Sequence, residues 1–148
     1  MTMQQKLQAK KSKKGFTLVE LVIVIAILAI LAAIAIPVIT TTINSSKLST
    51  MESDTATVNM LLKEAVNTSK ASIKTTTWNG KTADAASVKD VLEENDIRTD
   101  ADFFTRHIGG TDYTIVWTDK DNAAIKGGDY EADGNPIEDM NVSDLSDM

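Results

Sequence analysis

The sequence predicts an α+β fold in which a long N-terminal helix packs on a small antiparallel β-sheet. Two observations indicate the helix: an unbroken apolar run over residues 21–36, and a helical spacing of apolar residues that continues to about residue 72. A third observation indicates the sheet, because three short strand-like runs follow, divided by turn-forming residues. We therefore expect one long helix whose second half is covered by a small globular head.

The first half of the expected helix is long enough to cross a membrane. The run from Leu21 to Ile36 holds sixteen residues without a polar side chain, and residues 16–20 extend it to 21. A helix of that length spans roughly 31 Å, which matches a hydrocarbon core of about 30 Å. Residues 1–15 carry five lysines and no acid, so we expect this end to stay in the cytosol and the rest to be exported.

Two residues interrupt the apolar pattern. Glu20 lies inside the expected span, where a charge costs about 2.5–3.5 kcal/mol even on a lenient insertion scale, so it needs a partner. Pro37 closes the run, and a proline inside a helix removes a backbone donor and favours a kink. Both residues are therefore candidates for a functional role.

The residues around the start of the apolar run carry a family resemblance. The segment Lys13-Lys14-Gly15-Phe16-Thr17-Leu18-Val19-Glu20 resembles the class III signal peptide of type IV prepilins. The resemblance implies that a prepilin peptidase cuts between Gly15 and Phe16 and methylates the new amine of Phe16. Glu20 would then be the fifth residue of the mature chain and Pro37 the twenty-second, as in that family. It also implies a pilin-like fold.

Glu20, Phe16 and Pro37 form the expected assembly site. Glu20 of one subunit can neutralise the Phe16 amine of a neighbour inside an apolar bundle, where an unpaired charge is costly. The alternative is that Glu20 only favours the helix N-terminus electrostatically, worth about 0.3–1 kcal/mol. Near Pro37, the resemblance implies a local loss of helix in the assembled fibre.

A second cleavage site competes with the first. Ala33-Ile34-Ala35 fits the small-x-small pattern of ordinary signal peptidase sites, so a mature chain could instead begin at Ile36. The apolar stretch is longer than the usual h-region of about 7–15 residues, and Glu20 interrupts its start. These two features favour the prepilin cut.

The expected organisation has three parts: a cytosolic leader (residues 1–15), a hydrophobic membrane and filament-core helix (16–39), and the remainder (40–148). The remainder continues the helix with one apolar stripe and adds the head. Poor helix formers at residues 40–46 predict a bend or frayed turn. Met51 and Met60 are expected to pack in the core or a groove.

The head is expected to contain one short helix and three strands. The run Thr75–Lys81 reads as a loop, and Ala83–Asn95 as an amphipathic helix capped by Thr82 or Asp84. The sequence then predicts an antiparallel meander, with Ile115, Val116 and Trp117 covering the helix. Its strands are Phe103–Ile108, Tyr113–Thr118 and Ala123–Lys126.

The stretch from Gly127 onward holds seven acids and no base. Its segment 129–135 resembles the opening of a calcium loop, with oxygen donors at Asp129, Glu131 and Asp133 and a glycine sixth. Position twelve, however, is Met140 where a bidentate glutamate is expected. A solvated, mobile acidic tail is therefore favoured, and calcium binding stays a weak hypothesis.

Charge and composition exclude several functions. Residues 16–148 carry 10 bases and 21 acids, a net charge of 10 − 21 = −11, which does not suit direct binding of nucleic acid. Without cysteines, and with His107 as the lone histidine, the sequence lacks the usual metal cluster. We expect neither an enzyme nor a bound cofactor, because no nucleophile–base pair or phosphate loop is evident.

Together, these expectations predict one function. The resemblance implies a single-pass precursor in the cytoplasmic membrane, which then polymerises into an extracellular type IV pilus for adhesion, motility or biofilm formation. Its partners would be further copies of itself, prepilin peptidase, the assembly machinery with minor pilins, and membrane lipid before assembly. The alternative is a pseudopilin of a type II secretion or DNA-uptake (competence) system. A conventionally secreted binding protein is a third reading.

Overall fold

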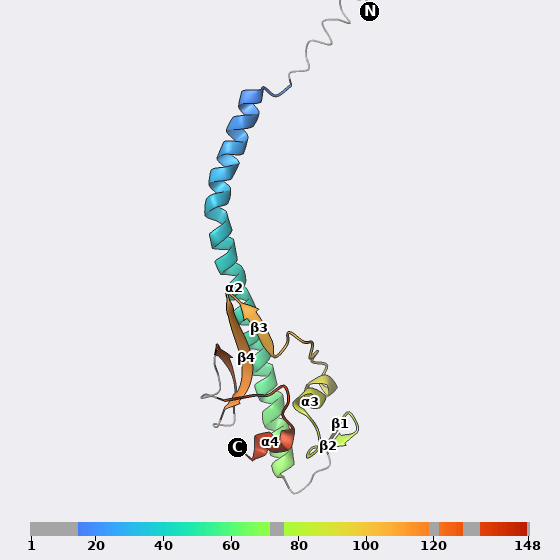
Figure 1. Cartoon of the computed structure of the whole chain (residues 1–148). Coiled ribbons are helices and arrows are strands. Elements are labelled where there is room, and N and C mark those ends of the chain that lie inside the picture. The colour runs from blue at the N-terminus through green and yellow to red at the C-terminus, as the bar shows by residue number, and fades with distance from the viewer. Residues whose placement is uncertain (1–14, 72–75, 119–121, 129–133, 148) are drawn as a thin grey trace, which may run out of the picture. The chain divides into compact units, whose positions relative to one another are not determined.

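A computed structural model describes residues 15–71, 76–118, 122–128 and 134–147 of the chain. The chain divides into two compact units, Met1–Thr42 and Ile43–Met148, and we refer to the second as the head. The helix α2, Leu18–Lys70, contributes to both units, and all the described strands lie in the head (Figure 1). The predicted α+β, pilin-like layout of a long apolar helix followed by small antiparallel sheets is confirmed.

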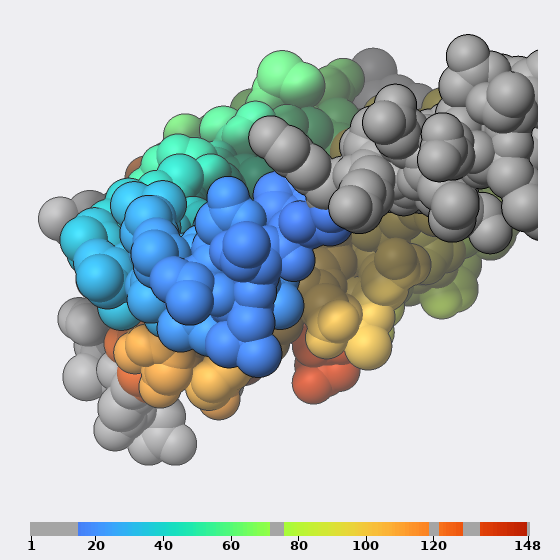
Figure 2. Space-filling view, turned by 90° about the horizontal axis from the view of Figure 1, so that it is seen from above, coloured from blue at the N-terminus to red at the C-terminus, as the bar shows by residue number. Residues whose placement is uncertain are grey.

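The helix α2 continues through residues 40–46, so the predicted frayed turn is wrong. The threonine hydroxyls bond back to the helix here, because each donates to the carbonyl four residues earlier without interrupting it. Thr40, Thr41 and Thr42 donate at 3.0 Å to the carbonyls of residues 36, 37 and 38. The apolar side chains before this point stand at the molecular surface, as the blue segment in Figure 2 shows.

Within the head, α2 buries one stripe against the sheet. The buried positions recur every three or four residues, as an amphipathic helix requires. Met51 is fully buried as expected, whereas Met60 is 63% exposed, so its predicted packing in the core or a groove is wrong. Met60 falls outside the stripe, which consists of Met51, Thr55, Val58, Leu62, Ala65 and Val66.

The main sheet has four antiparallel strands where three were predicted. They are β3 (Thr105–Ile108), β4 (Thr111–Thr118), β5 (Asn122–Gly127) and β6 (Asn135–Pro136). The central strand β4 pairs with β5 along one edge over residues 113–118. Along its other edge, β3 pairs with residues 111–114 and β6 with Val116 and Trp117. The predicted meander is therefore present, with one additional strand.

The predicted loop at residues 75–81 is instead the turn of a small hairpin, in the part of it that the structure describes. Strand β1 (Thr77–Trp78) pairs with β2 (Lys81–Thr82). Asn79 and Gly80 connect them with φ of 49° and 75°. Asn-Gly is the preferred pair for such a two-residue turn, because both positions need a positive φ.

The short helix of the head begins later than predicted. Helix α3 spans Val88–Glu94, and its N-cap is Ser87 rather than Thr82 or Asp84. The Asp90 amide donates to the Ser87 hydroxyl at 3.1 Å, and the Ser87 amide donates to the Asp90 carboxylate at 2.8 Å. This reciprocal capping box fixes where the helix starts.

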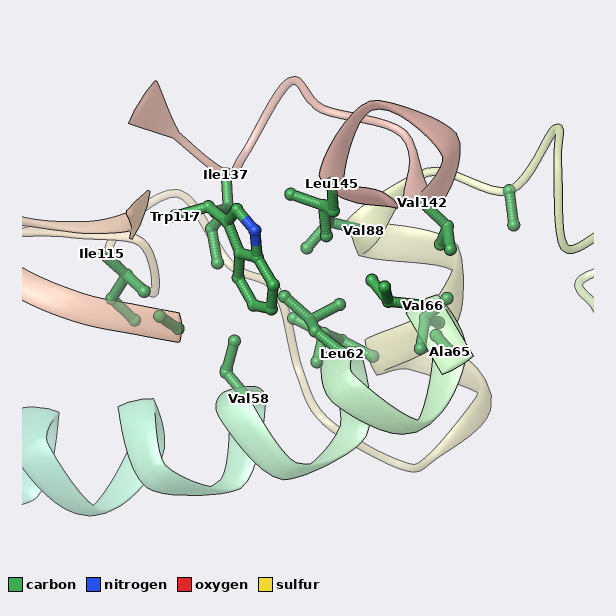
Figure 3. Close-up of a cluster of buried hydrophobic side chains, with 14 of the residues drawn as sticks. Val58, Leu62, Ala65, Val66, Val88, Ile115, Trp117, Ile137, Val142 and Leu145 are labelled. Atoms are coloured by element: carbon green, nitrogen blue, oxygen red, sulfur yellow. The ribbon is translucent and has the colours of Figure 1, made fainter. Parts of the chain in front are cut away.

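The C-terminal stretch is not a solvated tail in the residues that the structure describes. After β6 it forms helix α4, Val142–Ser146, and Ile137, Val142 and Leu145 are fully buried. In Figure 3, Ile137 lies beside Trp117, and Leu145 and Val142 lie above the last turns of α2. The prediction failed because the acids dominate the composition, while three apolar residues at suitable spacing are enough to close the core.

Candidate processing and assembly site

The expected cleavage point lies just before α2. Gly15 and Phe16 precede the helix, and the Phe16 side chain is 91% exposed. A Cβ atom built on Gly15 would meet nothing within 4 Å. The described part of the fold therefore places no steric requirement for glycine at this position.

Thr17 and Glu20 close the N-terminus of α2 as a capping box. The Thr17 amide and hydroxyl donate to Glu20 Oε2 at 2.8 and 2.9 Å, and the Glu20 amide donates back to Thr17 Oγ1 at 3.2 Å. These bonds satisfy backbone donors that a helix otherwise leaves open at its first turn. The N-terminal electrostatic role that the sequence suggested for Glu20 thus takes the specific form of a cap.

The cap uses only one oxygen of the Glu20 carboxylate. Among the described residues, none donates a hydrogen bond to Glu20 Oε1. Because a carboxylate can accept bonds at both oxygens, Glu20 can hold its own helix end and accept one more donor. A protonated amine from another chain fits that second position chemically.

The helix that follows is apolar on every side. Large side chains from Leu18 to Ile43 are between 48% and 78% exposed, without an alternating buried face. One helix among the described residues, α2, contains an apolar window long enough to cross a membrane, and no residue of that window is buried. A surface of this kind is stable only against lipid or other apolar helices.

Pro37 lies inside α2 rather than at its end. Without an amide hydrogen, it leaves the carbonyl of residue 33 without its usual helical donor. The helix is nevertheless continuous on both sides of Pro37, so the competing signal peptidase motif, Ala33-Ile34-Ala35, lies within it. The structure describes the helical, unassembled form of this region, so the predicted loss of helix around Pro37 stays a prediction.

The remaining candidate residues do not join this site. Asp129, Glu131 and Asp133, the weak calcium hypothesis, lie outside the described residues. In the described ranges, no group of three or more His, Asp or Glu side chains is placed to hold a metal ion. His107 lies in β3 with its Nδ1 2.6 Å from Asp112 Oδ1, and both side chains are mostly exposed.

Sequence reasoning gave Thr17 no role, although the structure makes it the N-cap of α2. The signal was present, because Thr17-Leu18-Val19-Glu20 has the S/T-x-x-E spacing of a capping box before an apolar run.

A comparison with known protein families finds a match in the same N-terminal segment. Residues 10–36 match the model of the prokaryotic N-terminal methylation motif. No significant match to the chain was found among curated proteins or solved structures. The matched range covers Gly15, Phe16, Glu20 and the whole apolar run of residues 21–36.

The matched motif and the apolar helix together indicate a class of protein. The matched N-terminal segment is the class III signal peptide motif of type IV pilins, and this motif indicates a pilin-like or pseudopilin precursor. This motif implies processing by prepilin peptidase, and the apolar helix fits anchoring of the precursor in a membrane.

Proposed function

We propose that this chain is a structural subunit of a type IV pilus. One observation carries the proposal: the exposed apolar half of α2 presents a carboxylate at its first turn, one oxygen of which accepts no hydrogen bond from the described residues. The helix serves two states, because the side chains that face lipid before assembly face other helices in a fibre core. The chain acts through assembly and carries out no catalysis.

Processing and assembly are linked through the Phe16 amine. Cleavage after Gly15 removes all five lysines of the leader and leaves one cationic amine beside Glu20. That amine, methylated by the peptidase, pairs with Glu20 Oε1 of a neighbouring subunit. An unpaired carboxylate at this depth is costly, so the pair sets the register between adjacent helices.

The assembled fibre carries the acidic heads outside its helical core. We assign it a role in adhesion, motility or biofilm formation at the cell surface, with the assembly machinery and minor pilins as partners. A pseudopilin of a secretion or DNA-uptake system has the same N-terminal motif and differs in how far it polymerises.

Mass spectrometry of the mature N-terminus and electron microscopy of sheared surface material test the proposal together. We expect a chain that begins at Phe16 with one added methyl group, in long fibres made chiefly of this subunit. A methylated chain found only in membranes, without fibres, would indicate a pseudopilin. A chain beginning at Ile36 would contradict both readings.

A further inference from the structure

A groove of about 550 Å³ lies at one end of the head. Its wall is formed by Lys47 and Thr50 of α2, by the loop at residues 98–103, and by residues 106–108 of β3. Phe103 and the largely buried Ile108 provide apolar lining, and charged side chains form the rest. An apolar centre with a polar rim containing arginine is typical of protein–protein contacts.

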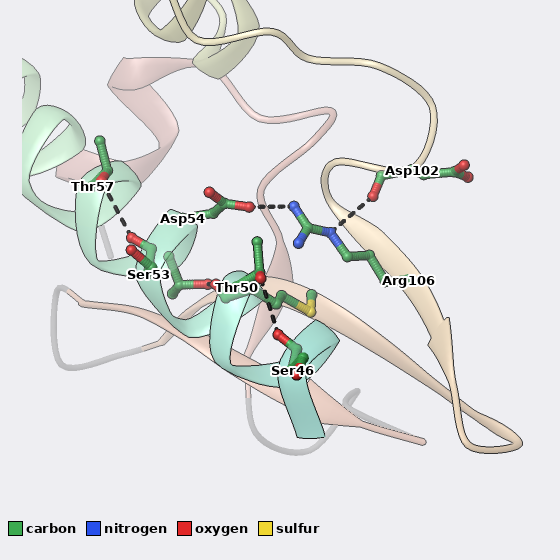
Figure 4. A network of polar contacts seen from close by, with 9 residues as sticks. Ser46, Thr50, Ser53, Asp54, Thr57, Asp102 and Arg106 are labelled. Carbon is green, nitrogen blue, oxygen red and sulfur yellow. Dashed lines mark hydrogen bonds and ion pairs between the residues drawn. The ribbon is translucent and has the colours of Figure 1, made fainter. Parts of the chain in front are cut away.

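The groove gathers positive charge in a strongly acidic head. It holds Arg98 and Arg106, the two arginines of the sequence, together with Lys47. Arg106 is already engaged, since its guanidinium pairs with Asp54 and its Nε donates to the Asp102 carbonyl at 3.1 Å (Figure 4). Lys47 and Arg98 are exposed and make no hydrogen bond or ion pair with any other described residue.

Two carboxylates keep the groove from being strongly basic. Asp100 and Asp102 also line it, so its five charged side chains sum to +3 − 2 = +1. The chain after residue 15 carries −11. Like-charged surfaces repel, and a second acidic copy therefore meets the least repulsion where the local charge is near zero or positive.

Exposed carboxylates lie at the opposite end of the head, beside helix α4. Helix α4 packs beside Ala65 and Val66, near the C-terminal end of α2, as Figure 3 shows. Lys47 precedes Val66 by 19 residues on α2, or roughly 28 Å of helix. Asp139 and Asp147 flank α4, are exposed, and have no partner among the described residues.

A polymer of identical subunits needs two different surfaces that fit each other. In a head-to-tail contact, one surface of each copy binds a different surface of the next copy. When the rotation between successive copies does not close a ring, such contacts build an open helical filament. The groove and the α4 end meet this requirement, because they lie at opposite ends of one head and carry opposite charges that have no partner among the described residues.

We propose that the groove receives the α4 end of a second copy of this chain, with Arg98 and Lys47 pairing with Asp139 and Asp147. This axial head contact rests on the proposed function. The fibre is then held by a specific contact between heads as well as by the helix bundle. This contact fixes the order of successive subunits along the fibre.

Crosslinking tests the contact directly, because the chain contains no cysteine. The variant R98C/D139C is assembled in cells, and its sheared fibres are treated with a short thiol-reactive crosslinker. We expect a ladder of dimers and higher multiples. The single variants should give no ladder, and neither should the control pair R98C/A56C, because Ala56 is exposed on α2 midway between the groove and the α4 end. Normal fibres of R98C/D139C without a ladder would overturn the contact and leave the proposed function intact.

Charge exchange provides a second test that does not depend on crosslinking. Loss of a close charge pair across an interface costs at least about tenfold in association, so R98D and D139R should each lower the fibre yield by that factor. The exchanged pair R98D/D139R should recover most of the yield, and A56D, on the exposed part of α2 between the two surfaces, should change it little. Failure of the exchanged pair to recover, with D139R processed normally at Phe16, would contradict the contact. A wild-type chain that is processed but never forms fibres would contradict the proposed function as well.

Discussion

Ser87 and Asn141, the residues that precede the two short helices of the head, lie opposite each other in an antiparallel β-bridge. The Val88 amide donates to the Met140 carbonyl at 2.9 Å, and the Val142 amide donates to the Ala86 carbonyl at 2.9 Å. Two helices 54 positions apart in the sequence therefore start from one paired segment. Because backbone groups that would be open at helix ends are satisfied here, the bridge joins the C-terminal stretch to the rest of the core.

Replacing Ser87 with alanine should destabilise the head by about 1 kcal/mol, because an N-cap hydroxyl is lost. The measurement is denaturant unfolding of the full chain in detergent, followed by fluorescence of the buried Trp78 and Trp117. Ser49→Ala is a matched control, since Ser49 is exposed on α2. Equal stability of S87A and the wild type would contradict the assigned cap.

Asp90 should make the stability of the head depend on acid pH. A hydrogen bond from Lys81 at 2.8 Å lowers the pKa of Asp90 from its usual 3.8 to about 2, with further bonds from Ser87. A group with a depressed folded pKa stabilises the fold above its unfolded pKa, and this contribution disappears as pH falls from about 4 to about 2. Solvent screens the half-exposed Lys81, so we expect a loss of about 1 kcal/mol.

The variant Asp90→Asn isolates this effect. It should be less stable than the wild type at neutral pH, and the difference should shrink between about pH 4 and pH 2. Unfolding curves recorded across that range provide the test. Parallel pH profiles for the two proteins would exclude Asp90 as the titrating group.

The features that the sequence predicted well are those set by local periodicity. The spacing of Met51, Val58 and Leu62 defines the buried face of α2 without any knowledge of its partner. Gly109 and Gly110, both with positive φ, mark the tight turn between β3 and β4. Such signals act over a few residues, so they survive in the sequence alone.

The features that were missed depend on partners far along the chain. Strand β6 has two residues and exists because Val116 and Trp117 offer them an open edge. Residues 137–145 fold because α2 and Trp117 leave an apolar surface for them to cover. Local composition, which is acidic there, contains little of that information.

Gly134 should be intolerant of a side chain. It has a φ of 154°, and a Cβ atom there would lie 2.9 Å from Val116 Cγ2 and 3.1 Å from the Trp117 carbonyl oxygen. Gly134→Ala should therefore displace β6 and cost about 1–3 kcal/mol. Gly110→Ala is the comparison, because its φ is also positive but its Cβ would meet no atom within 4 Å. A smaller loss for G134A than for G110A in thermal unfolding would refute the close approach.

The candidate site also has features that the local sequence predicts and features that depend on other parts or other molecules. Gly15, Phe16 and Glu20 could be proposed from the sequence because their order and spacing form a motif. The roles predicted for them depend on a peptidase and on neighbouring subunits, which a single chain does not contain. What the structure adds is the cap by Thr17, an interaction within the first helical turn.

Gly15→Val should block processing without disturbing the fold. The position is open and lacks a positive φ, so the larger side chain has room in this chain. A peptidase that needs close access to the backbone at this peptide bond would be obstructed. We expect the precursor to accumulate in membranes with unchanged helix content by circular dichroism. A methylated Phe16 terminus from G15V at wild-type yield would show that glycine is not what the peptidase requires.

The last prediction separates the two roles of Glu20. Glutamine at this position keeps a side-chain oxygen for the cap, since Gln also serves in capping boxes, but it removes the charge. Valine in place of Thr17 removes the capping hydroxyl and leaves the carboxylate intact. If Glu20 pairs with a neighbour's amine, Glu20→Gln should be cut and methylated normally and yet give at least about tenfold fewer fibres.

Thr17→Val should instead weaken the helix cap and leave fibre assembly largely intact. Losing an N-cap costs about 0.5–2 kcal/mol at the first turn, and the long apolar helix can absorb that loss by fraying one turn in the membrane interface. Fibre yield should fall less than in E20Q, as measured by quantitative immunoblotting of sheared material. A larger loss in T17V than in E20Q, with both mature termini at Phe16, would mean that the cap and not the charge limits assembly.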